Sequence, residues 1–292
     1  MKAGRYAIGL EAEPFILQDS KIIPWARLVA TDLPAELRQL LCDAIRTKDH
    51  EPFCTALPLL AAAVPDLCLP AGIPLPRRLP SPVSPRNFLC VGLNYSDHAA
   101  ESSASLPSEP LLFAKTSNAL TGHGCPIQLP PGSSQVDYEA ELAIVIGRQC
   151  HAISTGHAFE YIAGYCCAND ISARDFQFRD GQWFRGKSAD TFGPLGPWMV
   201  TPDEVGDAQA LEIQLRLNGN LMQHSNTRRM IFPIPRLIEH ISQIITLQPG
   251  DVILTGTPPG VGFARKPPVF LCSGDHVEVE IQAIGILSNS IA

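Results

Sequence analysis

The chain has 292 residues, of which 45% are hydrophobic and 17% are charged, and its formal net charge is −7 at neutral pH. This composition is sufficient for a large core and argues against long disordered tails. The negative balance does not favour nucleic acid or an anionic membrane as a partner, although a local group of arginines and lysines can still bind an anionic small molecule.

The sequence also bears on the cellular compartment. No apolar run approaches the length of a membrane span, and the opening stretch "MKAGRYAIGLEAEPF" contains acid and no long apolar segment, so we expect no signal peptide. Nine scattered cysteines without a CxxC pair indicate reduced thiols and argue against a thiolate zinc site. We therefore expect a cytoplasmic protein that does not bind a membrane.

Residues 1–70 have the pattern of a small α/β N-terminal domain. The stretches "RYAIGL" and "PFILQDSKIIPW" predict short strands, and "DLPAELRQLLCDAIRTK" and "EPFCTALPLLAAAVP" predict helices. Proline then recurs every few residues, which favours an extended linker over residues 71–86.

Residues 87–292 are dominated by strand patterns and form the predicted catalytic domain. "NFLCVGL", "GDVILTGTP" and "GDHVEVEIQAIGIL" predict strands, and "LEIQLRLNGNLMQ" predicts a hairpin that turns at Asn218 and Gly219. "PIPRLIEHISQIITLQPGD" predicts one amphipathic helix. The predicted fold class is α+β and β-rich: a mixed β-roll or barrel with a few outer helices, preceded by the small α/β domain.

The stretch "VDYEAELAIVIG" places Glu139 and Glu141 on one face of an apolar strand, and that face continues as Ala143 and Val145. By contrast, "HVEVEI" near the end of the chain carries its two glutamates on a polar face, as in a half-solvated strand. Two buried like charges require a counter-charge or a proton, and Mg²⁺, Mn²⁺ or Ca²⁺ meets that requirement with oxygen ligands. The pattern alone leaves a metal site and a solvated strand face equally open.

A third carboxylate, Asp170, follows the apolar run in "YIAGYCCAND". Taken alone, an aspartate after Asn169 is typical of a turn. Together with Glu139 and Glu141 it would give a divalent cation three ligands and leave positions open for water and a substrate.

His98 and Glu101, in "GLNYSDHAAES", are three residues apart and become neighbours if this segment is helical. A carboxylate bonded to one imidazole nitrogen orients the ring and leaves the other nitrogen to take a proton from water. A surface histidine beside a surface glutamate is the simpler interpretation of this pair alone.

The stretch "GQWFRGKS", residues 181–188, fits the phosphate-loop pattern G-x-x-x-x-G-K-[ST]. That pattern requires a preceding strand and a following helix, but the residues that follow contain Gly193, Pro194, Gly196 and Pro197. We interpret the match as a coincidence; a nucleotide-binding protein, the disfavoured alternative, would use Gly186, Lys187 and Ser188 and should bind ATP.

Several motifs together resemble the fumarylacetoacetate hydrolase family over residues 86 to 292. They are "VGLNYSDHAAE", "FAKTSNAL", "VDYEAELAIVIG", "GYCCANDISARDFQ", "GKSADTFGPLGPW", "NGNLMQHSNT", "MIFPIPRLIEHIS", "PGDVILTGTPPGVG" and "GDHVEVEIQAIGIL". The resemblance implies a β-roll catalytic domain, a homodimer, and Mg²⁺ or Mn²⁺ as cofactor, with Ca²⁺ as a non-native occupant.

The resemblance also assigns roles to residues of this sequence. Glu139, Glu141 and Asp170 would hold the metal, and His98 with Glu101 would form a dyad on a lid. Lys187 would be the catalytic lysine. The residues that it implies to contact the substrate are Arg174, Gln177, Lys115 and Thr257.

The function that this resemblance implies is metal-dependent hydrolysis of a C–C bond in a 2,4-dioxo acid of the acylpyruvate type, through an enolate and with water activated by the dyad. The alternative is decarboxylation or keto–enol isomerisation of a small oxo acid such as oxaloacetate, and a hydratase or lyase comes third. A cation-stabilised binding module is the non-enzymatic alternative. We also expect Arg228 and Arg229 to lie near a second anionic group of the substrate, unless both are simply solvated.

Overall fold

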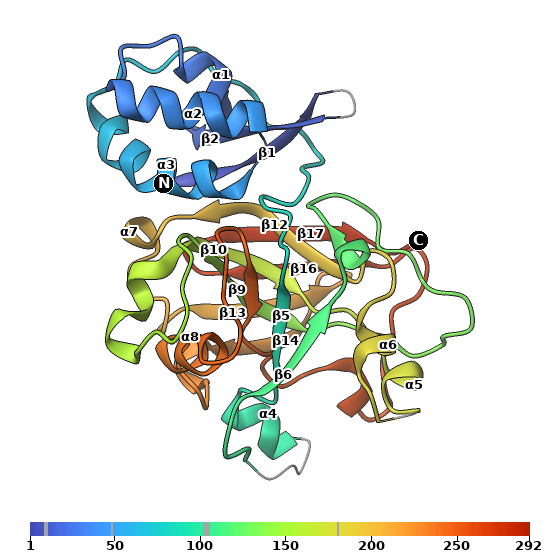
Figure 1. Cartoon of the computed structure of the whole chain (residues 1–292). Helices are drawn as coiled ribbons and strands as arrows, with labels where there is room; N and C mark the ends of the chain where they lie inside the picture. Colours follow the sequence, from blue (N-terminus) through green and yellow to red (C-terminus); the bar gives the residue numbers. More distant parts are fainter. Residues whose placement is uncertain (9–10, 48, 102–105, 180) are drawn as a thin grey trace.

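The computed structural model describes residues 1–292 except 9–10, 48, 102–105 and 180 (Figure 1). Its largest sheet has the strand order β4-β3-β2-β1-β12-β10-β9-β15-β5-β6, with β7 paired to β12 off this path. A second sheet has the order β14-β13-β16-β17, and β11 pairs with β8. The predicted α+β, strand-rich class is confirmed, but the sheets of the described residues are not closed into a barrel.

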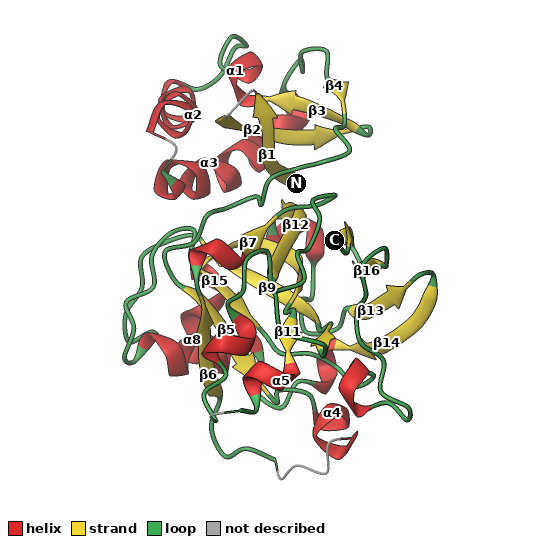
Figure 2. Ribbon diagram, turned by 90° about the vertical axis from the view of Figure 1, so that its right-hand side faces the viewer, coloured by secondary structure: helices red, strands yellow, loops and turns green. Residues whose placement is uncertain are grey.

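The N-terminal part contains four strands and three α-helices in its described residues, and the helices lie on one face of the strands (Figure 2). Both predicted strand regions and both predicted helices are found there. The elements are β1 (Lys2–Ile8), β2 (Glu11–Gln18), β3 (Lys21–Pro24), α1 (Trp25–Leu28), α2 (Ala35–Thr47), α3 (His50–Ala63) and β4 (Ile73–Pro74).

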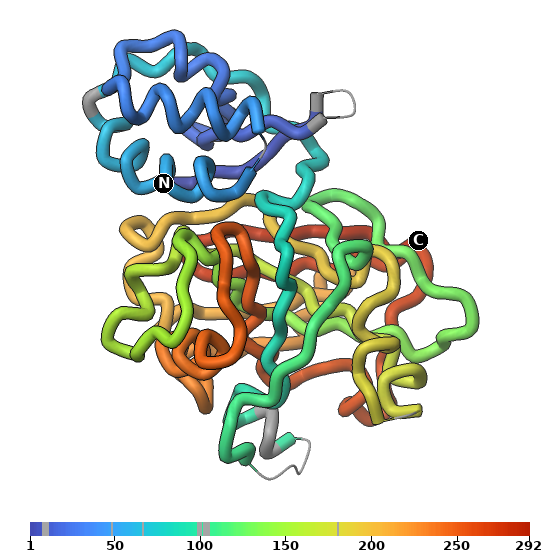
Figure 3. The backbone as a smooth tube through the Cα atoms, in the orientation of Figure 1, coloured from blue at the N-terminus to red at the C-terminus, as the bar shows by residue number. Residues whose placement is uncertain are grey.

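Strand β1 pairs with β12 (Gly193–Val200) through Lys2 and Ala3, so the large sheet continues from the N-terminal part into the rest of the chain. The predicted linker contains β4, which pairs with β3. From there the chain, teal in Figure 3, passes down to β5. The division into domains at residues 70 and 87 stays a prediction.

The centre of the large sheet consists of buried strands. They are β5 (Phe88–Gly92), β9 (Ala140–Ile146), β10 (Ile162–Asn169) and β15 (Val252–Leu254), and the partly exposed strand β6 (Leu111–Lys115) follows β5 at the edge of the sheet. Every residue of β9 is buried. Leu142 and Ile144 belong to one apolar cluster with the second sheet, whereas Ala143 and Val145 belong to another with Leu57 of α3. The strand is therefore covered on both faces, so the solvated strand face, one of the two interpretations that its pattern left open, is wrong.

The second sheet packs against the large sheet and is built from β13 (Glu212–Leu217), β14 (Asn220–Asn226), β16 (His276–Ile281) and β17 (Gly285–Ser290). Asn218 and Gly219 have positive φ angles of 52° and 80°, so the predicted hairpin turn is confirmed. In β16 the valines and the isoleucine are buried and the glutamates are half-buried, which confirms the half-solvated strand.

Helices and short strands complete the fold. The helix α8 (Ile234–Ser242) ends earlier than its sequence pattern predicts, and a turn follows it. The remaining short elements are α4 (Ser96–Glu101), β7 (Leu120–Thr121), β8 (Val136–Asp137), β11 (Ser172–Ala173), α5 (Arg174–Gln177), α6 (Phe184–Lys187) and α7 (Pro202–Val205), with 3-10 turns between them. Among the described residues, no helix is both long and apolar enough to cross a bilayer.

Candidate active site

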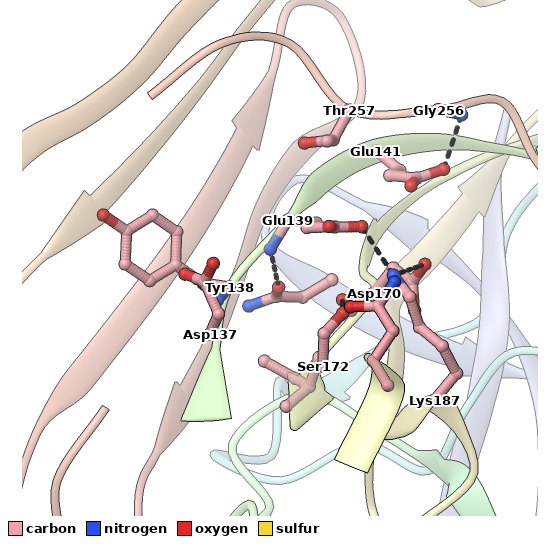
Figure 4. A network of polar contacts seen from close by, with 12 residues as sticks. Asp137, Tyr138, Glu139, Glu141, Asp170, Ser172, Lys187, Gly256 and Thr257 are labelled. Carbon is pink, nitrogen blue, oxygen red and sulfur yellow. Dashed lines mark hydrogen bonds and ion pairs between the residues drawn. The ribbon is translucent and has the colours of Figure 1, made fainter. Parts of the chain in front are cut away.

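Three carboxylates, Glu139, Glu141 and Asp170, meet at the end of β9 and are called the carboxylate trio below (Figure 4). One oxygen of each lies within 4.8 Å of the others, and all three side chains are buried. The register of β9 and β10 pairs Ala168 with Glu141, which brings the residue after β10 beside Glu139. The sequence prediction that a strand end supplies the third carboxylate therefore agrees with the geometry.

The predicted strand "VDYEAELAIVIG" is interrupted at Tyr138 and Glu139, between β8 and β9. Side chains from distant segments accept the backbone hydrogen bonds of this break. Asn169 Oδ1 accepts from the N–H of Glu139 at 2.9 Å, and Gln223 Oε1 accepts from the N–H of Ala140 at 2.8 Å. A buried backbone group needs such a partner, so these two amides make the interruption stable and let Glu139 turn into the site.

Three cations contact the trio closely, namely Lys187, Arg174 and Lys115. Lys187 Nζ lies 2.8 Å from Glu139 Oε2 and 2.7 Å from Asp170 Oδ2. Burial alone would lower the pKa of Lys187, but Asp170 and Glu139 more than offset it, so the pKa is raised above its ordinary value. The side chain is therefore an ammonium ion at neutral pH, in a buried position where it can meet developing negative charge.

Arg174 supports the trio from the other side of Glu139. Its Nη2 lies 2.6 Å from Glu139 Oε1 and 2.8 Å from Asp137 Oδ2, and its Nη1 donates to Gln177 Oε1. Burial opposes the charge on Arg174, but Glu139 and Asp137 outweigh it and raise the pKa. The guanidinium is therefore held in one orientation between two carboxylates.

Asp137 was not assigned a role from the sequence. Its carboxylate accepts hydrogen bonds from Arg174 Nε at 2.9 Å and from the backbone N–H groups of Tyr138, Gly262 and Phe263. It thus joins the strand before Glu139 to the loop around Gly262. The sequence indicated a role for Asp137 only through its position, on the same face of the strand as Glu139 and Glu141. Gln223, which joins Ala140 to Thr257 and Pro258, had no such signal.

The donor set of the trio fits a divalent cation. Asp170 Oδ1 is a buried carboxylate oxygen without a well-directed hydrogen bond, although Lys115 Nζ lies 2.6 Å away as an ion pair. Burial raises the pKa of Glu141 well above its ordinary value, and the negative charges of Asp170 and Glu139 raise it further. The charged form of Glu141 is therefore disfavoured where three carboxylates lie together. Only oxygens are offered, and they match the preference of Mg²⁺ or Mn²⁺.

A cavity of about 240 Å³ opens beside the trio. Among the predicted site residues described here, it is lined by Glu139, Glu141, Lys187, Arg174, Gln177 and Thr257. Asp170 and Lys115 lie behind this surface. Lys115 Nζ donates to the carbonyls of Ile171 and Lys187 in addition to its ion pair with Asp170.

The predicted dyad lies on α4, but the side chain of His98 is outside the described part of the chain. Glu101 Oε1 accepts a hydrogen bond from the N–H of Gly260 at 2.9 Å, so α4 rests against the loop that carries Thr257. The role of the pair stays a prediction.

The structure also shows which elements surround the phosphate-loop match. Residues 181–188 contain α6 and lie between α5 and β12, so among the described residues no strand leads into the motif and β12, not a helix, follows it. The lysine of the motif is Lys187, whose ammonium pairs with Glu139 and Asp170.

Comparison with known proteins identifies the family. Residues 87–292 match the model of the fumarylacetoacetate hydrolase C-terminal domain. A mitochondrial oxaloacetate tautomerase of Rattus norvegicus is 48% identical over 208 residues, which are 71% of this chain and 66% of the rat protein. This match thus spans slightly less than two thirds of that relative's length.

Solved structures also resemble the whole chain, among them the following two. A fumarylacetoacetate hydrolase of Exiguobacterium antarcticum has a TM-score of 0.80 at 33% identity, with 99% of its own chain covered. The 5-carboxymethyl-2-hydroxymuconate delta-isomerase of Mycobacterium smegmatis has a TM-score of 0.75 at 35% identity, with 98% covered. The chain is an enzyme of the fumarylacetoacetate hydrolase family.

Proposed function

We propose that this enzyme interconverts the keto and enol forms of a 2-oxo acid bound beside the carboxylate trio. The observation that supports this most is Lys187, a buried ammonium ion that borders the cavity and is held by Glu139 and Asp170. Tautomerisation needs stabilisation of an enolate and transfer of one proton, so it makes the smallest demand on the site. The rat relative, named an oxaloacetate tautomerase, supports the same choice.

The trio would hold Mg²⁺ or Mn²⁺, which supplies Lewis acidity toward the keto group of a bound 2-oxo acid. Lys187 directs two of its three N–H groups at carboxylates and lies 5.0 Å from the Phe113 ring centre. Its third N–H group can donate to the oxygen at C2 and stabilise the charge that develops there. Gln177 offers its amide N–H₂, because its Oε1 already accepts from Arg174.

In the keto-to-enol direction one proton leaves C3 and one is delivered to the oxygen at C2, and the reverse transfer restores the keto form. We assign the transfer at C3 to His98, oriented by Glu101 as the sequence predicts. Lys187 then faces the oxygen at C2, while the imidazole of His98 holds the proton taken from C3. No water is consumed, and the acid changes only the position of one proton and one double bond.

Hydrolysis of a C–C bond in a 2,4-dioxo acid is the second candidate. It uses the same enolate but requires His98 to deprotonate a water that attacks the carbonyl at C4. The hydrogen bond from Gly260 to Glu101 favours it, because it ties α4 to the loop beside the cavity. The likeness to a fumarylacetoacetate hydrolase also favours it.

One pair of assays tests the proposal. With Mg²⁺, the enzyme is expected to accelerate the loss of the enol absorbance of oxaloacetate, and EDTA should abolish the effect. Acetylpyruvate is assayed for pyruvate in parallel. Cleavage of acetylpyruvate without any acceleration of tautomerisation would assign the enzyme to the hydrolytic reaction instead. Decarboxylation, a homodimer and a cytoplasmic location stay predictions from the sequence.

A further inference from the structure

One part of the cavity lining is apolar and is called the apolar wall below. It consists of Val91, Leu93, Phe113, Phe178, Trp183 and Phe263. We infer that this wall receives the part of the substrate beyond C4 and selects 2,4-dioxo acids with an uncharged apolar tail over acids whose tail ends in a carboxylate. The inference rests on the proposed function, because it assumes a 2-oxo acid head group at the trio.

The two cations that line the cavity are already engaged by protein carboxylates. Lys187 pairs with Glu139 and Asp170, and Arg174 pairs with Glu139 and Asp137. Arg174 also stacks over the Phe263 ring at 4.5 Å, which covers one face of the guanidinium. Within the described lining, a carboxylate at the far end of a substrate therefore meets no cation that lacks a partner.

The sequence offered two other candidates for such a second anion. Arg228 and Arg229 are exposed and do not belong to the described cavity lining. Arg228 Nε donates to Asn226 Oδ1 instead. The hypothesis that these arginines bind a second anionic group is not supported by their position.

The aromatic side chains of the apolar wall are held in place by close packing. Trp183 lies directly on the backbone of β5, where a Cβ added at Gly92 would come within 2.6 Å of its ring. Its ring also meets Phe113 edge-on, with the centroids 5.3 Å apart. Only glycine at position 92 permits this arrangement, which fixes two aromatic rings beside the cavity.

A second aromatic pair extends the wall. Phe178 and Phe263 meet edge-on with their centroids 5.9 Å apart, although Phe178 is 55% exposed. An exposed aromatic ring beside a cavity gains from covering by an apolar ligand, because both surfaces leave water. A terminal carboxylate in the same place would lose its hydration without a charged partner.

Two acids that differ at one terminal group test this inference. They are 2,4-dioxoheptanoate, which ends in a methyl group, and 2,4-dioxoheptanedioate, which has a carboxylate there. In the presence of Mg²⁺, we expect kcat/KM for keto–enol interconversion to be at least about tenfold higher for the heptanoate than for the heptanedioate. One unsuitable terminal group in an apolar pocket has an effect of about this size. Titration calorimetry with both acids measures the same preference in the dissociation constants, independently of turnover.

Variants at Phe178 test whether the apolar wall causes the preference for the heptanoate. Phe178 is suitable because its exposed ring can be replaced without a large loss of core packing. Phe178→Arg is expected to reduce the preference for the heptanoate several-fold by giving the carboxylate a partner. Phe178→Leu should keep the preference. Phe159→Arg is the matched control, since Phe159 is 49% exposed but outside the cavity lining.

The outcomes separate the inference from the proposed function. Equal or better binding of the dioate by the parent enzyme overturns the inference, as does a preference that Phe178→Arg and Phe178→Leu leave equally unchanged. Tighter binding of the heptanoate without conversion of either acid refutes the proposed function but supports the inference that the apolar wall selects an apolar tail. Absence of binding of both acids overturns both. Oxaloacetate is no test, because its second carboxylate is attached at C3 and lies beside the head group.

Discussion

Replacing Asp137 by asparagine should destabilise the enzyme strongly without removing a predicted metal ligand. Asp137 is fully buried, and its carboxylate binds Arg174 through two nitrogens and accepts three backbone N–H groups. Asparagine keeps one acceptor oxygen and turns an N–H₂ group toward the remaining donors. Breaking a buried ion pair on one side costs about 3 to 5 kcal/mol, so we expect the free energy of unfolding to fall by about 3 kcal/mol.

Urea unfolding measures this change, followed by circular dichroism and by tryptophan fluorescence, whose coincidence shows that unfolding is two-state. Asp43→Asn is the control, because Asp43 makes only surface contacts on its helix, including an i,i+3 ion pair with Arg46, and its midpoint should change little. A double-mutant cycle with Arg174→Met isolates the pair and should give a coupling energy of about 2 kcal/mol. A loss below about 0.5 kcal/mol in Asp137→Asn would refute the claim that this carboxylate holds the site together.

Three further changes test separate parts of the account. Glu139→Ala should abolish Mg²⁺ binding in titration calorimetry, and full occupancy in that variant would remove Glu139 from the ligand set. His98→Ala should keep Mg²⁺ affinity but lose turnover by at least about a hundredfold, the usual contribution of a general base; turnover equal to the parent would exclude the dyad. Burial lowers the pKa of His50 in the folded state, so stability should fall as pH drops below about 6.5, where the unfolded chain takes up the proton first. His50→Gln should flatten that part of the stability profile, and an unchanged slope would assign it to other groups.

Local sequence pattern predicted the parts of the site that lie on single strands. Glu139 and Glu141 were distinguished from the glutamates of "HVEVEI" because Ala143 and Val145 continue their face, and the structure buries that face. Asp170 was placed correctly because an apolar run marks the end of β10. The first inference depends on the two-residue period of a strand and the second on the end of an apolar run, and sequence shows both directly.

Contacts between distant segments could not be predicted in this way. The break at Tyr138 and Glu139 depends on Asn169 and Gln223, whose partners are 30 and 83 residues away along the chain. The pairing of β1 with β12 likewise joins segments that have no common sequence signal. Such interactions are set by tertiary packing, which a local pattern does not contain.

The central claim is that the trio and Lys187 together stabilise the enolate of a 2-oxo acid. Exchange of the methyl protons of pyruvate in D₂O, followed by proton NMR with Mg²⁺, measures enolate formation directly and independently of the net reaction. The parent enzyme should accelerate this exchange, and EDTA or Lys187→Met should reduce it by at least about a hundredfold, the cost of one charge-stabilising donor. Exchange that is equally fast in Lys187→Met, or turnover of a 2-oxo acid without exchange at C3, would contradict the account.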